Sequence, residues 1–373
     1  MEQFRKDRYE RELMKKYAAN VDRVNEKTLL LIKPDSLGDY ILFRSFIQAL
    51  HRSEKFKGWK ITLLGNVWYK SIAEWLDSPF LHNCIWVDIH ILRDPLQMEK
   101  TIDEIRSKGF ELAFCPNYSP SEIDLKLLCF SGAKEKIAID GDTLYYSATE
   151  QSRFQKLITK KIRIGERWDF ELDRYRDIFF ELLGKDPEVK SSDMNVQVQK
   201  KNIVVICAGA NSPLRMWPAE HFAGLLKRIN GLDPSVEFLI LGTSAEHDLG
   251  EVIRSKVKEI RVINECGKWD AAGLCKRIAA CKAMVANDSG PYHIAQALQI
   301  PVVCISNGNN YGRFTPYPST YQKRSVTVVS DRLENTLKNE DAKRNFQSKV
   351  STEPMSDIPV EKVFNAYQSI MRQ

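Results

Sequence analysis

The stretch that decides the fold is residues 283–305, which read AMVANDSGPYHIAQALQIPVVCI. An apolar run is followed by a polar turn, a short helical pattern at residues 294–298 and a second apolar run at residues 301–305. This order of strand, turn, helix and strand predicts an α/β crossover. Ligands of such folds bind at the carboxyl ends of the strands, where the polar turn falls.

The polar turn holds a carboxylate, a hydroxyl, a glycine and an imidazole: Asp288, Ser289, Gly290 and His293. One interpretation is a binding site for a polar ligand at the end of a strand. The other is purely structural, with Asp288 as a helix N-cap, Gly290 in a turn and His293 in the core. The turn taken alone does not separate them.

Strand-like apolar runs alternate with helical patterns along the rest of the chain. The expected strands are residues 28–33, 61–64, 84–88, 111–115, 136–139, 203–208, 236–241, 261–264, 283–287, 302–305 and 326–329. The expected helices are residues 41–50, 68–76, 173–183, 219–229, 271–280 and 359–371. This alternation predicts an α/β protein with parallel sheets and right-handed crossovers. Two such blocks predict two Rossmann-like domains that face a cleft.

The expected domains follow from shifts in this pattern. They are a charged N-terminal extension at 1–27, a Rossmann-like domain at 28–184, a polar linker at 185–202, a second Rossmann-like domain at 203–355 and a closing amphipathic helix at 356–373. We expect the extension to be an exposed helix or a frayed segment. The charged stretch 331–353 predicts a surface loop or a short helix.

Composition narrows the class of protein. The chain has 373 residues and a net charge of +6, which is too weak an excess to indicate nucleic-acid binding. No run approaches the roughly 20 apolar residues of a membrane span, and the N-terminus has no secretory apolar region. The eight cysteines form no CxxC pair, and no histidine lies at zinc spacing. We therefore expect a reduced, cytoplasmic protein without a metal site.

The first loop with side chains suited to catalysis or binding is residues 34–40, PDSLGDY, which follows the first expected strand. It matches neither the dinucleotide fingerprint nor the P-loop. Asp39 falls in the first turn of a helix, where it either favours the helix dipole or acts as a general base toward a sugar hydroxyl. Gly38 beside it permits close approach of a substrate to the backbone.

The second such loop is residues 208–218, AGANSPLRMWP. Its small residues and hydroxyl, at Gly209, Ala210 and Ser212, precede a helix in an arrangement that is typical of anion sites. Arg215 adds a charged fork that suits phosphate, or is a surface arginine in a turn.

Three further features have two interpretations each. Glu246, after a third strand, either accepts hydrogen bonds from ribose hydroxyls or begins a helix. Trp269 either stacks on a base or packs in the core. The interleaved basic and apolar residues 153–163 either meet an acidic lipid-linked acceptor or an anionic membrane surface, or form a solvated helix or strand face.

Taken together, the loops resemble glycosyltransferase family 9, the ADP-heptose:lipopolysaccharide heptosyltransferases. The matching motifs are Ser-x-Gly-Asp at 36–39, a Gly-Ala turn with a basic residue and Trp-Pro at 209–218, and Asp-Ser-Gly-x-x-His at 288–293. Their order and spacing agree over about residues 28–320. The resemblance implies a GT-B fold.

The resemblance also implies roles for residues. Asp39 matches the catalytic base, Ser36 and Gly38 lie on the acceptor side, and Arg215 matches a donor-diphosphate contact. The other implied donor-binding residues are Gly209, Ala210, Ser212, Glu246, Trp269, Asp288, Ser289, Gly290 and His293.

The implied reaction is inverting and metal-independent, with no cofactor. A sugar, heptose in the family, passes from a nucleotide donor, ADP-linked in the family, to a lipopolysaccharide-core or related acidic glycan acceptor. The protein would be cytoplasmic or peripheral at the cytoplasmic face of the inner membrane. The alternatives are a non-catalytic nucleotide-sugar-binding relative and a nucleotide-sugar epimerase of the same fold.

Overall fold

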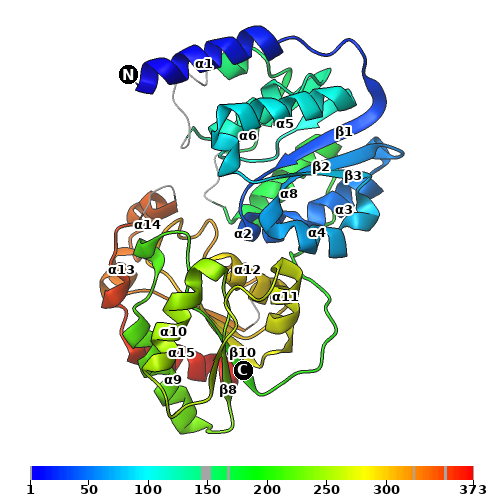
Figure 1. Ribbon diagram of the computed structural model, residues 1–373. Coiled ribbons are helices and arrows are strands. Elements are labelled where there is room, and N and C mark those ends of the chain that lie inside the picture. The colour runs from blue at the N-terminus through cyan, green and yellow to red at the C-terminus, as the bar shows by residue number, and fades with distance from the viewer. Residues whose placement is uncertain (1, 144–152, 166–168, 322–323, 348–350, 373) are drawn as a thin grey trace. The chain divides into compact units, whose positions relative to one another are not determined.

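The computed structural model describes residues 2–143, 153–165, 169–321, 324–347 and 351–372. Its internal contacts define two compact units. Unit 1 comprises Met1–Ser36, Phe43–Arg167 and Asp173–Lys190, and unit 2 comprises Leu37–Leu42, Trp168–Leu172 and Ser191–Gln373. Each unit contains a parallel sheet of six strands (Figure 1).

Unit 1 has the strand order β3-β2-β1-β4-β5-β6. The strands are β1 (Asn25–Lys33), β2 (Lys60–Asn66), β3 (Asn83–Val87), β4 (Phe110–Phe114), β5 (Glu135–Ile139) and β6 (Lys160–Ile162). The helices are α1 (Glu2–Tyr17), α3 (Ser45–Arg52), α4 (Lys70–Leu76), α5 (Pro95–Lys108), α6 (Glu122–Cys129) and α8 (Glu171–Leu183). This order is that of a doubly wound Rossmann sheet, whose strands are apolar because helices cover both faces.

The N-terminal helix α1 corrects one expectation. It is helical, but it is exposed on one side only, because Leu13 and Tyr17 are buried in the same apolar cluster as Leu30 and Ile32 of β1. The Tyr9 hydroxyl also donates to the carbonyl of Pro95 at 3.1 Å. The helix α1 is therefore amphipathic and belongs to unit 1, although its many charged residues obscure the apolar face in the sequence.

The basic stretch 153–163 forms part of the sheet of unit 1. β6 pairs with β5, and Lys161 and Arg163 lie 3.3 and 3.0 Å from the carboxylate of Asp140. Phe154 is buried, and Arg153 pairs with Glu10. Residues 160–162 of this stretch are thus a strand, and Arg153, Lys161 and Arg163 have acidic partners within unit 1; contact of the stretch with an acceptor or a membrane surface stays a prediction.

Unit 2 repeats the topology of unit 1, with the order β12-β11-β10-β7-β8-β9. The strands are β7 (Ile203–Cys207), β8 (Glu237–Ile240), β9 (Val262–Asn264), β10 (Ala283–Asn287), β11 (Val302–Ile305) and β12 (Ser325–Val328). The helices are α2 (Leu37–Phe43), α9 (Ala219–Leu232), α10 (His247–Ser255), α11 (Ala271–Ala280), α12 (Gly290–Ala297), α13 (Asp331–Thr336), α14 (Glu340–Gln347) and α15 (Val360–Arg372). The order of strands reverses between β7 and β10, so the loops after these two strands share the switch point at which such sheets bind ligands.

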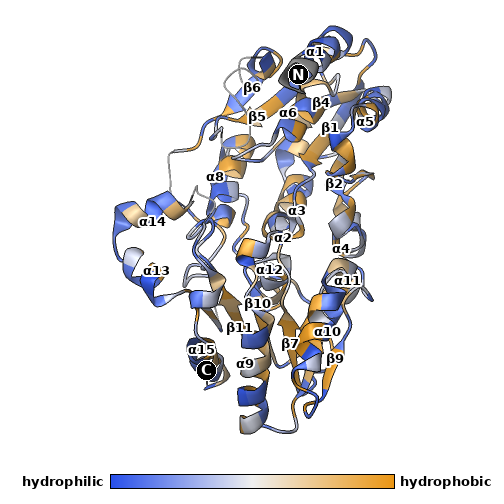
Figure 2. Ribbon diagram, turned by 60° about the vertical axis from the view of Figure 1, so that its left-hand side comes forward, coloured by the Kyte–Doolittle hydropathy of each residue, from blue (hydrophilic) through white to orange (hydrophobic). Residues whose placement is uncertain are grey.

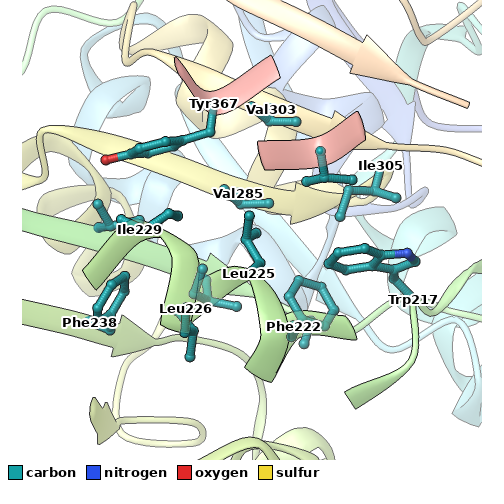
Figure 3. Close-up of a cluster of buried hydrophobic side chains, with 14 of the residues drawn as sticks. Trp217, Phe222, Leu225, Leu226, Ile229, Phe238, Val285, Val303, Ile305 and Tyr367 are labelled. Atoms are coloured by element: carbon teal, nitrogen blue, oxygen red, sulfur yellow. The ribbon is translucent and has the colours of Figure 1, made fainter. Parts of the chain in front are cut away.

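The core of unit 2 holds these two strands in place. Four side chains of α9 face Val285, Val303 and Ile305 of the sheet, and Tyr367 of α15 joins them (Figure 3). They are Phe222, Leu225, Leu226 and Ile229, which are spaced as one face of a helix. Each such side chain contributes roughly 1.5–3 kcal/mol when fully buried.

In unit 2, hydropathy differs between the strands of the sheet and two helices near the C-terminus (Figure 2). Strands β7, β10 and β11 are hydrophobic, whereas α13 and α14 are largely hydrophilic. These two helices show that the charged stretch 331–353 includes short helices, one of the two alternatives. Residues 185–202 contain no helix or strand. Among the described residues, no helix is both long and apolar enough for a membrane span.

Candidate functional site

Asp288 is the centre of a buried polar network at the switch point of unit 2. Its side chain is about 4% exposed, at the end of β10. Oδ1 accepts a hydrogen bond from the Thr315 hydroxyl at 2.9 Å, and Oδ2 accepts one from the Ser306 hydroxyl at 3.3 Å. Its carboxylate is therefore held by side chains from the segment that follows β11, and it caps no helix with its side chain.

Arg215 approaches Asp288 from the loop after β7. It lies in the 3-10 turn η5 (Pro213–Arg215), which begins where the Ser212 hydroxyl accepts a hydrogen bond from the Leu214 N–H at 3.3 Å. Nη2 of Arg215 donates to the Asp288 carbonyl and lies 3.5 Å from its carboxylate. Nε of Arg215 is buried without a hydrogen-bond acceptor among the described residues. One guanidinium edge is thus fixed, and another N–H is available for an anion.

The two loops are tied together by Asn287, the last residue of β10. Its amide donates to the carbonyl of Ala208 at 2.6 Å and accepts from the backbone N–H of Trp217 at 3.3 Å. Trp217 is fully buried, and its indole donates to the carbonyl of Ile358 at 2.9 Å. These bonds fix the distance between the loop that carries Arg215 and the turn that carries Asp288.

The turn after β10 leads directly into α12. Ser289 occupies the N-cap position, but its hydroxyl donates to the carbonyl of Asn287 at 3.3 Å instead of capping the helix. A Cβ at Gly290 would stand 3.2 Å from the side chain of Leu37. The first turn of α12 therefore packs closely against the first turn of α2.

His293 makes the second contact between α12 and α2. It is 5% exposed, and its Nδ1 lies 3.0 Å from the hydroxyl of Tyr317. A Cβ at Gly38 would stand 2.7 Å from Cδ2 and 3.3 Å from Nε2 of the same ring. The imidazole of His293 thus occupies the space in which a side chain at position 38 would lie.

The electrostatic surroundings of His293 are mixed. Burial is the largest effect and lowers the pKa of His293, while the carboxylates of Asp288 and Asp39 raise it and Arg215 lowers it. The ring is consequently neutral at physiological pH, with one N–H to donate. Asp39 lies in the first turn of α2 and is partly exposed.

The segment before Asp39 is anchored inside unit 1. The ammonium of Lys33, which is fully buried, donates to Asp35 at 2.6 Å, Asn117 at 2.7 Å and the hydroxyl of Tyr175 at 2.5 Å. The side-chain amide of Asn66 donates to the carbonyls of Pro34 and Asp35 at 3.0 and 3.2 Å. These bonds fix the chain up to Ser36, the residue that precedes the Leu37-Gly38-Asp39 turn.

Glu246 lies over the ends of β7 and β8. Its Oε2 accepts hydrogen bonds from the backbone N–H and, at 3.0 Å, the hydroxyl of Thr243, which forms a capping box. Glu246 therefore begins a helix, and its contact with a ribose stays a prediction. A Cβ at Gly209 would stand 2.0 Å from Oε1, so this glycine is required for the carboxylate to approach the strand end.

Trp269 is not a core residue, because it is 45% exposed. Its indole N–H donates to Glu265 at 2.7 Å, and the guanidinium of Arg277 lies 5.4 Å from its ring centroid. Arg277 in turn forms a double hydrogen bond with Glu265 at 3.0 and 2.8 Å. The ring is thus held in one orientation with an exposed area beyond the end of β9.

Sequence reasoning missed the partners of the site. The segment that follows β11 contains these partners, Ser306, Thr315 and Tyr317. Its sequence has no pattern that would have linked them to Asp288 and His293. Lys33 carried a signal, since a lysine at the end of an apolar strand is costly to bury without a partner. No cluster of three or more metal-ligating residues occurs in the part of the chain that the structure describes.

The class of protein follows from the fold and these loops together. Two doubly wound units with polar loops at the switch points are typical of enzymes that bind nucleotides. The chain belongs to glycosyltransferase family 9 (heptosyltransferase), whose family model matches residues 141–347. It is therefore a glycosyltransferase, and the α/β, GT-B-like fold class is confirmed.

Individual relatives agree with this assignment. The chain is 22% identical to lipopolysaccharide heptosyltransferase 2 of Escherichia coli over 81% of this chain and 88% of that protein. It is 33% identical to lipooligosaccharide heptosyltransferase 2 of Campylobacter jejuni over 33% of this chain and 39% of that protein. Among solved structures, a glycosyltransferase family 9 protein of Veillonella parvula aligns with a TM-score of 0.68 at 18% identity, over 95% of this chain and 99% of that one. The ADP-heptose lps heptosyltransferase II of E. coli aligns with a TM-score of 0.65 at 18% identity, over 93% and 99%.

Proposed function

We propose that this glycosyltransferase is an inverting, metal-independent heptosyltransferase. It would transfer heptose from an ADP-linked donor to a lipopolysaccharide-core or related acidic glycan acceptor. The choice of sugar and acceptor is supported by the names of the relatives, among them the E. coli and C. jejuni heptosyltransferases. The choice of ADP is supported by the solved relatives named with ADP or ADP-heptose.

The observation that carries the proposal is the junction of α2 and α12 in unit 2. There the Gly38–Asp39 turn lies against His293. The carboxylate of Asp288 is close to both His293 and Arg215. A partly exposed carboxylate, a neutral imidazole and an arginine with an unpaired N–H are thereby gathered at one strand end. A base for a hydroxyl and donors for a diphosphate are the two requirements of glycosyl transfer to an alcohol.

In the proposed reaction, Asp39 accepts the proton of the acceptor hydroxyl while that oxygen forms a bond to the anomeric carbon. The bond from this carbon to the diphosphate oxygen breaks, and ADP leaves with the electron pair. A single displacement inverts the configuration and needs no covalent intermediate. Arg215 and the N-terminus of α12 would offset the charge that develops on the diphosphate, so the mechanism requires no metal.

The other predicted residues take supporting roles in this proposal. Gly209, Ala210 and Ser212 shape the loop beneath the diphosphate, with Ser289 and Gly290 at the start of α12. Asp288 acts by holding Arg215 in place. Glu246 and Trp269 would contact the ribose and the adenine, since Oε1 of Glu246 borders Gly209 and one area of Trp269 is exposed. Ser36 would lie on the acceptor side, and the protein would meet its acceptor at the cytoplasmic face of the inner membrane.

Asp39→Asn tests the proposed base with minimal change in shape. Transfer should fall by at least about a hundredfold, because an amide cannot accept the proton, whereas calorimetry should give donor affinity within about twofold of wild type. Glu246→Gln, which changes a carboxylate outside the α2–α12 junction, is the matched comparison and should weaken donor binding more than turnover. Near-normal turnover by Asp39→Asn would remove Asp39 as the base.

A binding screen with ADP, UDP, GDP and their sugar conjugates, without added metal, tests the donor. Selective binding of ADP or ADP-heptose is the expected result. Binding without transfer to any lipopolysaccharide-core acceptor would favour the non-catalytic relative, and conversion of the donor without an acceptor would favour the epimerase.

A further inference from the structure

The proposed mechanism does not determine which nitrogen of the His293 ring carries the proton. Burial keeps this ring neutral, so only one of its two nitrogens carries a proton. Nε2 lies toward the Gly38–Asp39 turn, and Nδ1 faces Tyr317. Whether the turn and any bound anion meet an N–H or a lone pair therefore depends on which nitrogen is protonated.

The Tyr317 hydroxyl is suited to settle this choice. It is 4% exposed, and burial raises its pKa well above the ordinary value, so it remains protonated and has one hydrogen to donate. The side chain of Ser192 lowers the pKa of Tyr317, but burial is the larger effect and raises it. Nδ1 of His293 lies 3.0 Å from this hydroxyl and accepts a hydrogen bond in the tautomer whose proton is on Nε2.

The backbone around Tyr317 is fixed from two further directions. Arg313 forms a double hydrogen bond with Glu171, which belongs to unit 2 although it begins α8, at 2.7 and 3.3 Å, and both side chains are more than nine-tenths buried. Thr315 bonds to Asp288, as described above. The ring of Tyr317 also packs against Tyr292, with centroids 5.6 Å apart and the planes at 89°. A segment anchored in this way holds the hydroxyl at one position relative to α12.

We propose that Tyr317 is a positioning residue that donates its hydroxyl hydrogen to Nδ1 of His293 and thereby fixes the tautomer with the proton on Nε2. The Nε2–H then points toward the Gly38–Asp39 turn, where it can donate to an anion. In the opposite tautomer, Nε2 would present a lone pair to the same carboxylate or diphosphate and repel it. This second half of the inference, the use of Nε2–H in transfer, rests on the proposed function.

The tautomer can be measured in the absence of any substrate. Multiple-bond 15N–1H spectra of protein labelled at its six histidines distinguish the two neutral forms, and the spectrum of His293→Gln assigns the signals of His293. We expect the pattern of a ring protonated on Nε2 in the wild type and a mixture of tautomers in Tyr317→Phe. A wild-type ring protonated on Nδ1 would overturn the proposal, whatever the protein transfers.

Kinetics test the consequence for the reaction. Tyr317→Phe keeps the packed ring and should lower kcat/KM about tenfold, mostly through kcat. Tyr311→Phe makes the same chemical change six residues earlier in the chain, at a hydroxyl whose nearby charge is Glu334, and should stay within twofold of wild type. In a His293→Ala background, Tyr317→Phe should have no further effect.

Each failure is recognisable. An equal loss from Tyr317→Phe with and without His293 would show that the tyrosine does not act through the imidazole. A wild type that transfers no sugar from any nucleotide donor would refute the proposed function, while the spectra would still decide the tautomer.

Discussion

At the scale of single residues, Gly38 is a position at which an added side chain would collide with a residue of the site. A methyl group there would stand 2.7 Å from the ring of His293, which is itself enclosed by Tyr292 and Tyr317. We expect Gly38→Ala to displace this ring and to lower kcat/KM by more than tenfold. Gly231→Ala in α9 is the control, because nothing lies within 4 Å of its new methyl group and it should stabilise the protein by about 0.5–1 kcal/mol. Equal kinetics for the two variants would refute the contact.

His293 also makes stability depend on pH. Its pKa in the folded protein lies below the ordinary value of 6.5 because burial outweighs the opposing charges of Asp288 and Asp39. The unfolded chain therefore binds a proton below about pH 6.5 that the folded chain does not, and stability falls as the pH decreases through this range. Melting temperatures between pH 8 and 5 should decline more steeply for wild type than for His293→Gln. Parallel curves would contradict a lowered pKa.

The residues of the site divide into two groups by predictability. The positions of Asp39, Arg215, Asp288 and His293 were predictable because each lies in a loop or first helical turn that follows an apolar strand. Tyr317 was not, since it lies 24 residues after His293 in a segment without helix or strand. Its proximity depends on the path of the chain beyond β11, for which local sequence carries no periodic signal.

At the scale of elements, the end of β1 depends on one buried charge. Lys33 makes three hydrogen bonds in a fully buried environment, and Phe43 and Tyr175 pack around its ammonium at 5.1 and 4.8 Å. Lys33→Met keeps the apolar stem but removes the ammonium that donates to Asp35 and Asn117. We expect the free energy of unfolding to fall by about 3 kcal/mol in denaturant titrations.

A surface lysine provides the comparison for Lys33. Lys282 donates to Asp233 at 3.1 Å and to Asn202 at 2.8 Å, but its side chain is 27% exposed. Lys282→Met should therefore cost less than about 1 kcal/mol. A similar loss for both variants would mean that burial does not strengthen the Lys33 contacts.

Elements were predictable where an apolar run was long enough. The expected strands 28–33 and 283–287 correspond to β1 and β10, but α5 and α6 were not expected, and β6 was expected only as one alternative for the stretch 153–163. In α5 the buried residues Met98, Ile102 and Ile105 have helical spacing, which charged neighbours obscured. In α6 most residues are buried, so it shows no amphipathic period. β6 has only three residues, two of them lysines.

At the scale of the whole molecule, the two units share one design, in which each sheet reverses its order between a first and a fourth strand. The polar loops after β1, β7 and β10 are the loops that gave the chain its resemblance to family 9. Topology accounts for this agreement, because the switch point is where a doubly wound sheet leaves room for a ligand. The sequence therefore predicted which loops lie at the switch points, but not the side chains that support them.

The distribution of thiols gives a test of the whole chain. All eight cysteines lie in the described part of the chain, and all are thiols. Seven are buried, and Cys84 in β3 is partly exposed. Burial raises the pKa of Cys84 to about 11, so at pH 8 only about a thousandth of it is the reactive thiolate. We expect the native protein to react slowly with a thiol reagent, with no more than one equivalent, and the denatured protein to react at all eight positions.

Cys84→Ser isolates this single position. The variant should lose the slow native reaction and retain seven thiols in denaturant, and the wild-type rate should rise about tenfold per pH unit between pH 7 and 9 because thiolate is the nucleophile. Rapid modification of several thiols in the native state would contradict the arrangement of both units, since Cys115 and Cys129 belong to unit 1 and the remaining five buried thiols to unit 2. Mass spectrometry of the modified peptides would then identify which of the two cores is open.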